Sequence, residues 1–221
     1  NWRSQLNYSS ENFSGTDDSE GVNPANGVVF YYYLPRKSKN KELTLEIKDK
    51  DGNVVRTIRS KSNLNYQRYP GGPSPEPTLS NNIGLNRFVW DMRHQSLPGI
   101  PTAYIEGSYR GHKAMPNLYS ASLKQEDKIS EVSFSILPNP LYNISKDEYL
   151  ETHKFKIITE ANLTDMHNRV NKLKKTQRQL IKIIKELPKE QKYIGLKYSQ
   201  ILLKPTLLMK SIKKGYILFL I

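Results

Sequence analysis

The spacing of apolar side chains changes once along this 221-residue chain, near Ser145, and that change limits the folds open to it. Before Ser145, apolar residues alternate with polar ones in short segments, as they do in β-strands. After Ser145, they recur every third or fourth residue, as they do in an amphipathic helix. We therefore expect a β-sandwich followed by a helical segment.

The first part of the chain contains short strand-like segments separated by turn residues. In the first of them, Phe30 and Tyr32 share one face, while Tyr31 and Tyr33 share the other. Because both faces are apolar or aromatic, we expect the outer face to be covered by another domain, the helix or a ligand. The predicted strands are residues 27–35, 42–48, 53–59, 86–93, 117–125 and 129–137.

Asp49-Lys50-Asp51-Gly52 lies between the second and third predicted strands. An Asp-Gly pair between apolar runs is typical of a β-hairpin turn. Asp49, Asp51 and Asn53 also resemble half of a calcium-binding loop, but Ser60 stands where such a loop needs a glutamate. We interpret this segment as a turn.

The helical part begins with Ser145-Lys146-Asp147-Glu148, which matches a capping box. One helix is predicted from 146 to about 187, because Pro188 indicates a break. A second helix, 189–203, could return antiparallel against the first, or the helix could self-associate as a coiled coil. The apolar stripe that needs such a partner is Leu163, Met166, Val170, Leu173, Leu180, Ile184 and Leu187.

The formal net charge of +13 lies mostly in the helical part. Residues 146–221 carry 17 Lys and Arg against 7 Asp and Glu, whereas residues 1–145 carry 17 against 14. No nucleic-acid-binding motif accompanies this charge, so we expect a solvated helix face and no nucleic-acid partner. The longest apolar run, 216–221, is too short to span a bilayer.

The sequence shows no recognisable catalytic pattern. It has no cysteine and no Gly-x-Ser-x-Gly motif, which excludes thiol chemistry and a nucleophile elbow. His94, His112, His153 and His167 lack His-x3-His spacing and an adjacent acidic cluster, so each is expected at the surface or at its boundary. We therefore predict no catalytic, cofactor-binding or metal-binding residues.

Fourteen tyrosines raise a different possibility, because exposed aromatic rings stack on sugars and dock partner proteins. Packing in the core is the competing interpretation. The tyrosines that we consider for docking or glycan contact are Tyr31, Tyr33, Tyr66, Tyr69, Tyr104 and Tyr109.

Three segments of the chain, 23–34, 84–93 and 109–119, resemble one known C-terminal region. They read NPANGVVFYYYL, GLNRFVWDMR and YRGHKAMPNLY, and the helix segment 167–173 also fits. The region belongs to large bacterial proteins, often from Bacteroidota, with BNR/Asp-box β-propellers that are described as glycosyl hydrolase-like or sortilin-like. Its sandwich resembles the immunoglobulin-like domain of the flagellar hook-capping protein.

This resemblance implies a piece of a larger envelope or secreted protein. Together with the residue patterns above, it leads us to expect a linker or remnant over 1–21, an immunoglobulin-like sandwich over 22–140, a helical hairpin over 145–203 and an uncertain tail over 204–221. We expect a non-catalytic module that packs on an upstream β-propeller. The alternatives are a carbohydrate-binding accessory module, and a fragment of a glycoside hydrolase whose activity resides upstream, since no Asp-box motif occurs here.

Overall fold

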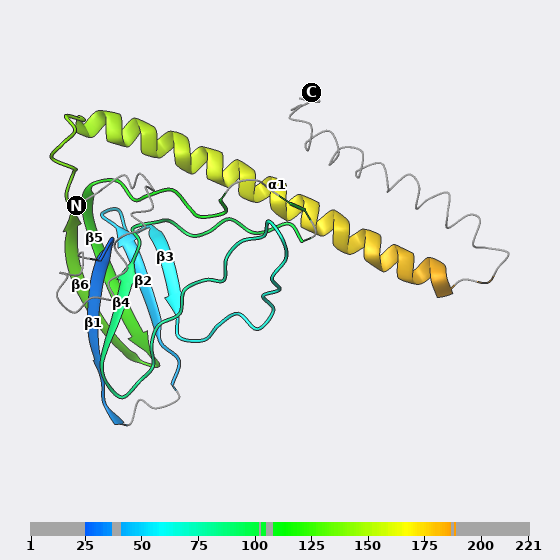
Figure 1. The fold of residues 1–221 in the computed structure, drawn as a ribbon, viewed down its shortest axis with the longest axis horizontal. Helices are drawn as coiled ribbons and strands as arrows, with labels where there is room; N and C mark the ends of the chain where they lie inside the picture. The colour runs from blue at the N-terminus through cyan, green and yellow to red at the C-terminus, as the bar shows by residue number, and fades with distance from the viewer. Residues whose placement is uncertain (1–24, 37–40, 102, 105–107, 187, 189–221) are drawn as a thin grey trace, which may run out of the picture. The chain divides into compact units, whose positions relative to one another are not determined.

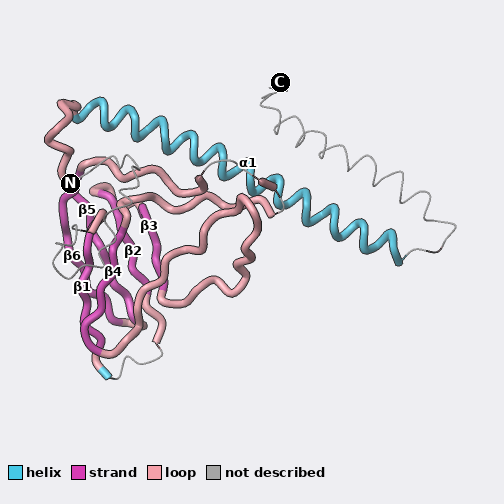
Figure 2. The backbone as a smooth tube through the Cα atoms, viewed as in Figure 1, coloured by secondary structure: helices cyan, strands magenta, loops and turns pink. Residues whose placement is uncertain are grey.

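The computed structural model describes residues 25–36, 41–101, 103–104, 108–186 and 188. In these residues, six β-strands precede one long helix (Figures 1 and 2). All strand pairs are antiparallel and form two sheets, β1-β4 and β3-β2-β5-β6. The predicted sandwich-like domain followed by a helix is confirmed. The elements are β1 (Val28–Leu34), β2 (Thr44–Asp49), β3 (Val54–Arg59), β4 (Gly84–Trp90), β5 (Asn117–Gln125), β6 (Lys128–Ile136) and α1 (Lys146–Glu186).

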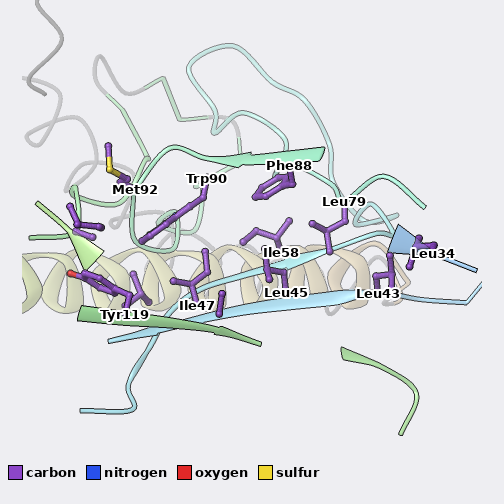
Figure 3. Close-up of a cluster of buried hydrophobic side chains, with 14 residues drawn as sticks. Leu34, Leu43, Leu45, Ile47, Ile58, Leu79, Phe88, Trp90, Met92 and Tyr119 are labelled. Atoms are coloured by element: carbon purple, nitrogen blue, oxygen red, sulfur yellow. The ribbon is translucent and has the colours of Figure 1, made fainter. Parts of the chain in front are cut away.

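The hydrophobic core lies between the two sheets and is centred on Trp90 of β4 (Figure 3). The Trp90 ring meets Tyr119 of β5 and Phe134 of β6 edge-on, with ring centroids 6.1 and 6.2 Å apart. Its indole N–H donates to the carbonyl oxygen of Arg93 at 3.0 Å. The ring is therefore buried with its one polar group satisfied.

The alternation predicted for β1 is confirmed. Phe30 and Tyr32 pack against the core and Leu34 is buried, whereas Tyr31 and Tyr33 are exposed on the outer face. The Tyr32 hydroxyl also donates a hydrogen bond to the carbonyl oxygen of Ser80 at 2.6 Å.

The turn between β2 and β3 is also confirmed. One Asp49 carboxylate oxygen accepts from the backbone N–H groups of Asp51 and Asn53 at 2.9 and 2.8 Å. Gly52 adopts the left-handed conformation, with φ 82°. The Asp49 carboxylate is thus occupied within the turn.

The capping box forms as predicted at the start of α1. The Ser145 hydroxyl accepts from the Glu148 N–H at 3.2 Å, and a Glu148 carboxylate oxygen accepts from the Ser145 N–H at 2.8 Å. One helix then runs from Lys146 to Glu186. Within the described residues, no helix is both long enough and apolar enough to cross a membrane.

The chain divides into two compact units, residues 1–164 and 165–221, whose boundary falls inside α1. Of the predicted helix stripe, Leu163, Met166 and Leu173 are each more than a third exposed. The linker 1–21, the second helix 189–203 and the tail 204–221 lie outside the described residues.

The two-sheet core predicts that two isoleucines contribute very differently to the stability of the fold. Ile47 of β2 is fully buried, and Ile129 of β6 is largely exposed. Ile47→Ala should lower the free energy of unfolding by about 2–5 kcal/mol, whereas Ile129→Ala should change it by less than about 0.5 kcal/mol. Urea denaturation measures both, and equal losses would contradict the assigned faces.

Candidate functional site

A short backbone bridge after β4 brings two histidines together. The Ala114 N–H donates to the Met92 carbonyl oxygen at 2.6 Å, and the His94 N–H donates to the His112 carbonyl oxygen at 2.9 Å. The imidazole rings of His94 and His112 consequently stack, with centroids 3.9 Å apart and planes at 17°.

Two unusual backbone positions permit this bridge. Met92 is in the left-handed region with φ 58°, a conformation that costs energy for a residue with a side chain and that turns the chain after β4. Gly111 lies so close to His94 that an added Cβ would be 2.5 Å from the His94 carbonyl oxygen. Only glycine fits this close approach.

Two arginines fix the backbone around the histidines. The buried Arg56 donates from Nη1 to the His94 carbonyl oxygen at 2.6 Å, and its Nη2 pairs with Glu76. Arg93 donates from Nη1 to the Gly111 carbonyl oxygen at 2.9 Å. Both histidine-bearing segments therefore have defined positions.

The helix supplies the third histidine. His153 and Glu160 are seven residues apart in α1, which is close to two full turns, so they lie on one face. The His153 Nδ1 atom lies 3.0 Å from Nε2 of His112. The His153 ring centroid lies 5.1 Å from that of His112 and 5.4 Å from that of His94. We call His94, His112 and His153 the three-histidine cluster.

Glu160 holds His112 through two hydrogen bonds. One carboxylate oxygen accepts from the His112 backbone N–H at 2.6 Å, and the other lies 2.8 Å from His112 Nδ1. Burial raises the pKa of Glu160, but the hydrogen bonds from His112 outweigh it and the net pKa is lowered. An ionised carboxylate only accepts, so His112 Nδ1 carries a proton. In neutral His112, the lone pair is then on Nε2, which faces His153.

Burial lowers the pKa of His94 to about 4, and the neighbouring His112 and His153 rings lower it further. Burial, followed by the effect of His112, also lowers the pKa of His153. Both rings are therefore neutral at pH 7 and offer lone pairs.

The donor atoms of the cluster are close enough to share one ligand. One nitrogen from each of the three rings lies within 4.8 Å of the others. His94 Nε2 is buried and has no hydrogen-bond partner among the described residues. A cavity of about 260 Å³ lies beside the cluster and is lined by His112, His153, Ile144 and Tyr149, among others. The arrangement suits a small electron-pair acceptor.

The tyrosines considered from the sequence do not form one site. Tyr31, Tyr33 and Tyr104 are exposed, as a contact surface requires. Tyr109 is buried, so its prediction as a surface contact is wrong.

Two more of these tyrosines are half-buried and used in loop packing. The Tyr66 hydroxyl donates to the Pro73 carbonyl oxygen at 2.9 Å. The Tyr69 ring packs against Gly72, where an added Cβ would lie 2.7 Å from its Cζ atom. Neither presents a free ring face comparable to those of Tyr31 and Tyr33.

The histidine cluster was missed by the sequence analysis. His94 and His153 are half-buried, which agrees with the expected boundary positions, whereas His112 and His167 are buried and differ from the expectation. The three histidines come from three separate segments, so no His-x3-His spacing arises. The one available signal was the seven-residue spacing of His153 and Glu160, which places an imidazole and a carboxylate on one helix face.

A scan of family models and searches of curated proteins and of solved structures give no match to this chain.

The Glu160 contacts predict a specific loss of stability. Glu160→Ala leaves the buried His112 N–H without a partner and should lower the free energy of unfolding by about 1–3 kcal/mol. Glu151→Ala, on an exposed side of the same helix, is the matched control and should cost less than about 0.5 kcal/mol. Thermal and urea denaturation of both variants measures the difference. A Glu160→Ala variant as stable as the control would show that these bonds do not hold the helix.

Proposed function

We propose that this chain is a non-catalytic structural and interaction module, built on an immunoglobulin-like sandwich, of a larger bacterial envelope or secreted protein that contains a β-propeller. The main support for the interaction role is an exposed aromatic face on the two-stranded sheet. Any hydrolase activity of the parent protein is proposed to reside upstream of this chain.

The strand order supports an immunoglobulin-like topology. In such domains, strands B and E are neighbours in one sheet, while C, F and G form the other, to which variable-type domains add C′. Here β1 pairs with β4, and the second sheet has the order β3-β2-β5-β6. Assigning β1 to B, β2 to C, β3 to C′, β4 to E, β5 to F and β6 to G reproduces this pattern in chain order.

A tyrosine near the start of β5 provides separate support. The buried Tyr119 hydroxyl donates to the Met115 carbonyl oxygen, four residues upstream, at 2.7 Å. Immunoglobulin-like domains place a tyrosine with this type of bond near the start of strand F. The position agrees with the assignment of β5 to strand F.

The interaction face consists of the outward side chains of β1 and β4. Tyr33 lies opposite Leu85, Tyr31 opposite Arg87, and Val29 opposite Val89. Tyr31, Tyr33 and Leu85 are 65, 70 and 72% exposed. We call these six residues the β1–β4 face. Aromatic and arginine side chains on an apolar background are typical of protein interfaces.

The proposed occupant of the β1–β4 face is the β-propeller that would precede this module in the same polypeptide. A domain linked in the same chain is present at a high effective concentration, so a modest apolar face suffices for docking. This choice of partner rests on the family resemblance and on the chemistry of the face.

Docking can be tested with the 1–221 chain and the propeller domain of its parent gene, expressed separately. Truncating Tyr31 and Tyr33 together to Ala should weaken association at least about 30-fold, which corresponds to the roughly 2 kcal/mol of an interface hot spot. Tyr142→Ala removes an exposed tyrosine outside this face and should leave affinity unchanged. Titration calorimetry measures all three affinities, and equal binding by wild type and double variant would reject the proposal.

A carbohydrate-binding role is the second candidate, favoured by the two exposed tyrosine rings side by side on β1. It predicts glycan-array binding by the isolated chain that the Tyr31→Ala/Tyr33→Ala variant loses. Absence of glycan binding, together with propeller binding, would favour the docking role.

A further inference from the structure

We infer that His94, His112 and His153 together bind one Zn²⁺ ion, with Glu160 orienting His112 from behind. This site goes beyond the proposed docking function and does not depend on it. Its ligands come from the segment after β4, the segment before β5 and the helix α1, all within residues 1–164.

The donor atoms are close enough to share a metal ion, provided that the stacked rings of His94 and His112 tilt so that both lone pairs point at it. Histidine nitrogens bind Zn²⁺ at about 2.0–2.1 Å, so neighbouring donors in a tetrahedral site are roughly 3.3–3.5 Å apart. The Nε2 atom of His112 and Nδ1 of His153 are 3.0 Å apart, and all three donors lie within 4.8 Å of one another. On metal binding, the distance between the His112 and His153 nitrogens would lengthen slightly, and the longer distances between donor atoms would shorten.

The Glu160 contact places the His112 lone pair on the ligand side. Metal-binding histidines commonly donate their second ring N–H to a carboxylate, which fixes the tautomer and strengthens the ligand. Glu160 occupies that position, 2.8 Å from Nδ1 of His112, and also accepts from the backbone of the same residue.

His94 provides an independent observation. Buried polar atoms in folded proteins nearly always have a partner, but the buried Nε2 of His94 has none among the described residues. A cluster held only by hydrogen bonds accounts for His112 and His153 and leaves this atom unexplained. A metal ion bound through this nitrogen would account for it.

The ligand set and the cavity indicate the type of metal and its exchangeable position. Imidazole nitrogens favour Zn²⁺ and other late transition metals over Ca²⁺ and Mg²⁺, which prefer oxygen. Three protein ligands leave a fourth tetrahedral position, and the adjacent cavity of about 260 Å³ gives water access to it. The ion would also join the first part of α1 to the sandwich, because His153 is its ligand from the helix.

The test is titration of ZnCl₂ into the untagged 1–221 chain, followed by calorimetry, with Co²⁺ as a spectroscopic substitute. We expect one ion per chain with a dissociation constant below roughly 10 μM, and an intense visible Co²⁺ band from tetrahedral coordination. Excess Zn²⁺, at about 100 times its dissociation constant, should raise Tm by roughly 5–10 °C.

The ligand variants are His94→Gln and His153→Gln, because both residues are half-buried and tolerate replacement better than His112. Each should weaken Zn²⁺ binding at least tenfold and abolish the Tm increase. His167→Gln changes the fourth histidine of the chain, which is outside the cluster, and should bind as wild type does. Circular dichroism without metal confirms that each variant is folded.

Glu160→Gln tests the orienting role separately. The glutamine amide can donate to His112 Nδ1, which would move the ring proton to Nε2 and remove its lone pair. Zn²⁺ affinity should fall about 10- to 100-fold, whereas Glu151→Gln should leave it unchanged. No Zn²⁺ binding by the wild type, unchanged affinity in both ligand variants, or an equal loss in His167→Gln would each overturn the inference.

Discussion

The buried imidazole of His112 is the point on which the arrangement of sandwich and helix depends. Each of its polar groups needs a partner, because an unpaired polar atom inside a protein costs about 1–3 kcal/mol. Glu160 satisfies the backbone N–H and Nδ1, and His153 faces Nε2. Both partners belong to the helix, so satisfying this one residue fixes the first part of α1 against the sandwich.

This constraint explains why the helix joins the sandwich through a polar face. In the N-terminal part of α1, His153 and Glu160 face inward while the apolar Leu163 stays more than a third exposed. Hydrogen bonds to the segment before β5 thus determine which face of α1 contacts the sandwich. His153 and Glu160 both lie within the first nineteen residues of α1, the part of the helix that belongs to the compact unit 1–164.

Local patterns sufficed to predict the strands and the helix. Alternation in β1, the Asp-Gly turn and the Ser145–Glu148 capping box each act over a few residues, and each forms as expected. The histidine cluster could not be predicted in this way. It needs a left-handed Met92, a glycine at 111 and a buried Arg56, which lie in three separate segments and meet only in the folded chain.

The two candidate surfaces are chemically distinct. The β1–β4 face is apolar and exposed, which suits docking of another domain, whereas the three-histidine cluster is recessed and nitrogen-rich. The core around Trp90 and Tyr119 supports both, because β4 carries half of the face and leads directly into the His94 segment.

The most direct measurement is the tautomer of neutral His112 by long-range ¹H–¹⁵N NMR correlation of the histidine rings, in the metal-free protein at a pH high enough to keep the imidazoles uncharged. The account predicts a protonated Nδ1, bonded to Glu160, and an unprotonated Nε2. The opposite tautomer, with the proton on Nε2 and none facing Glu160, would contradict it.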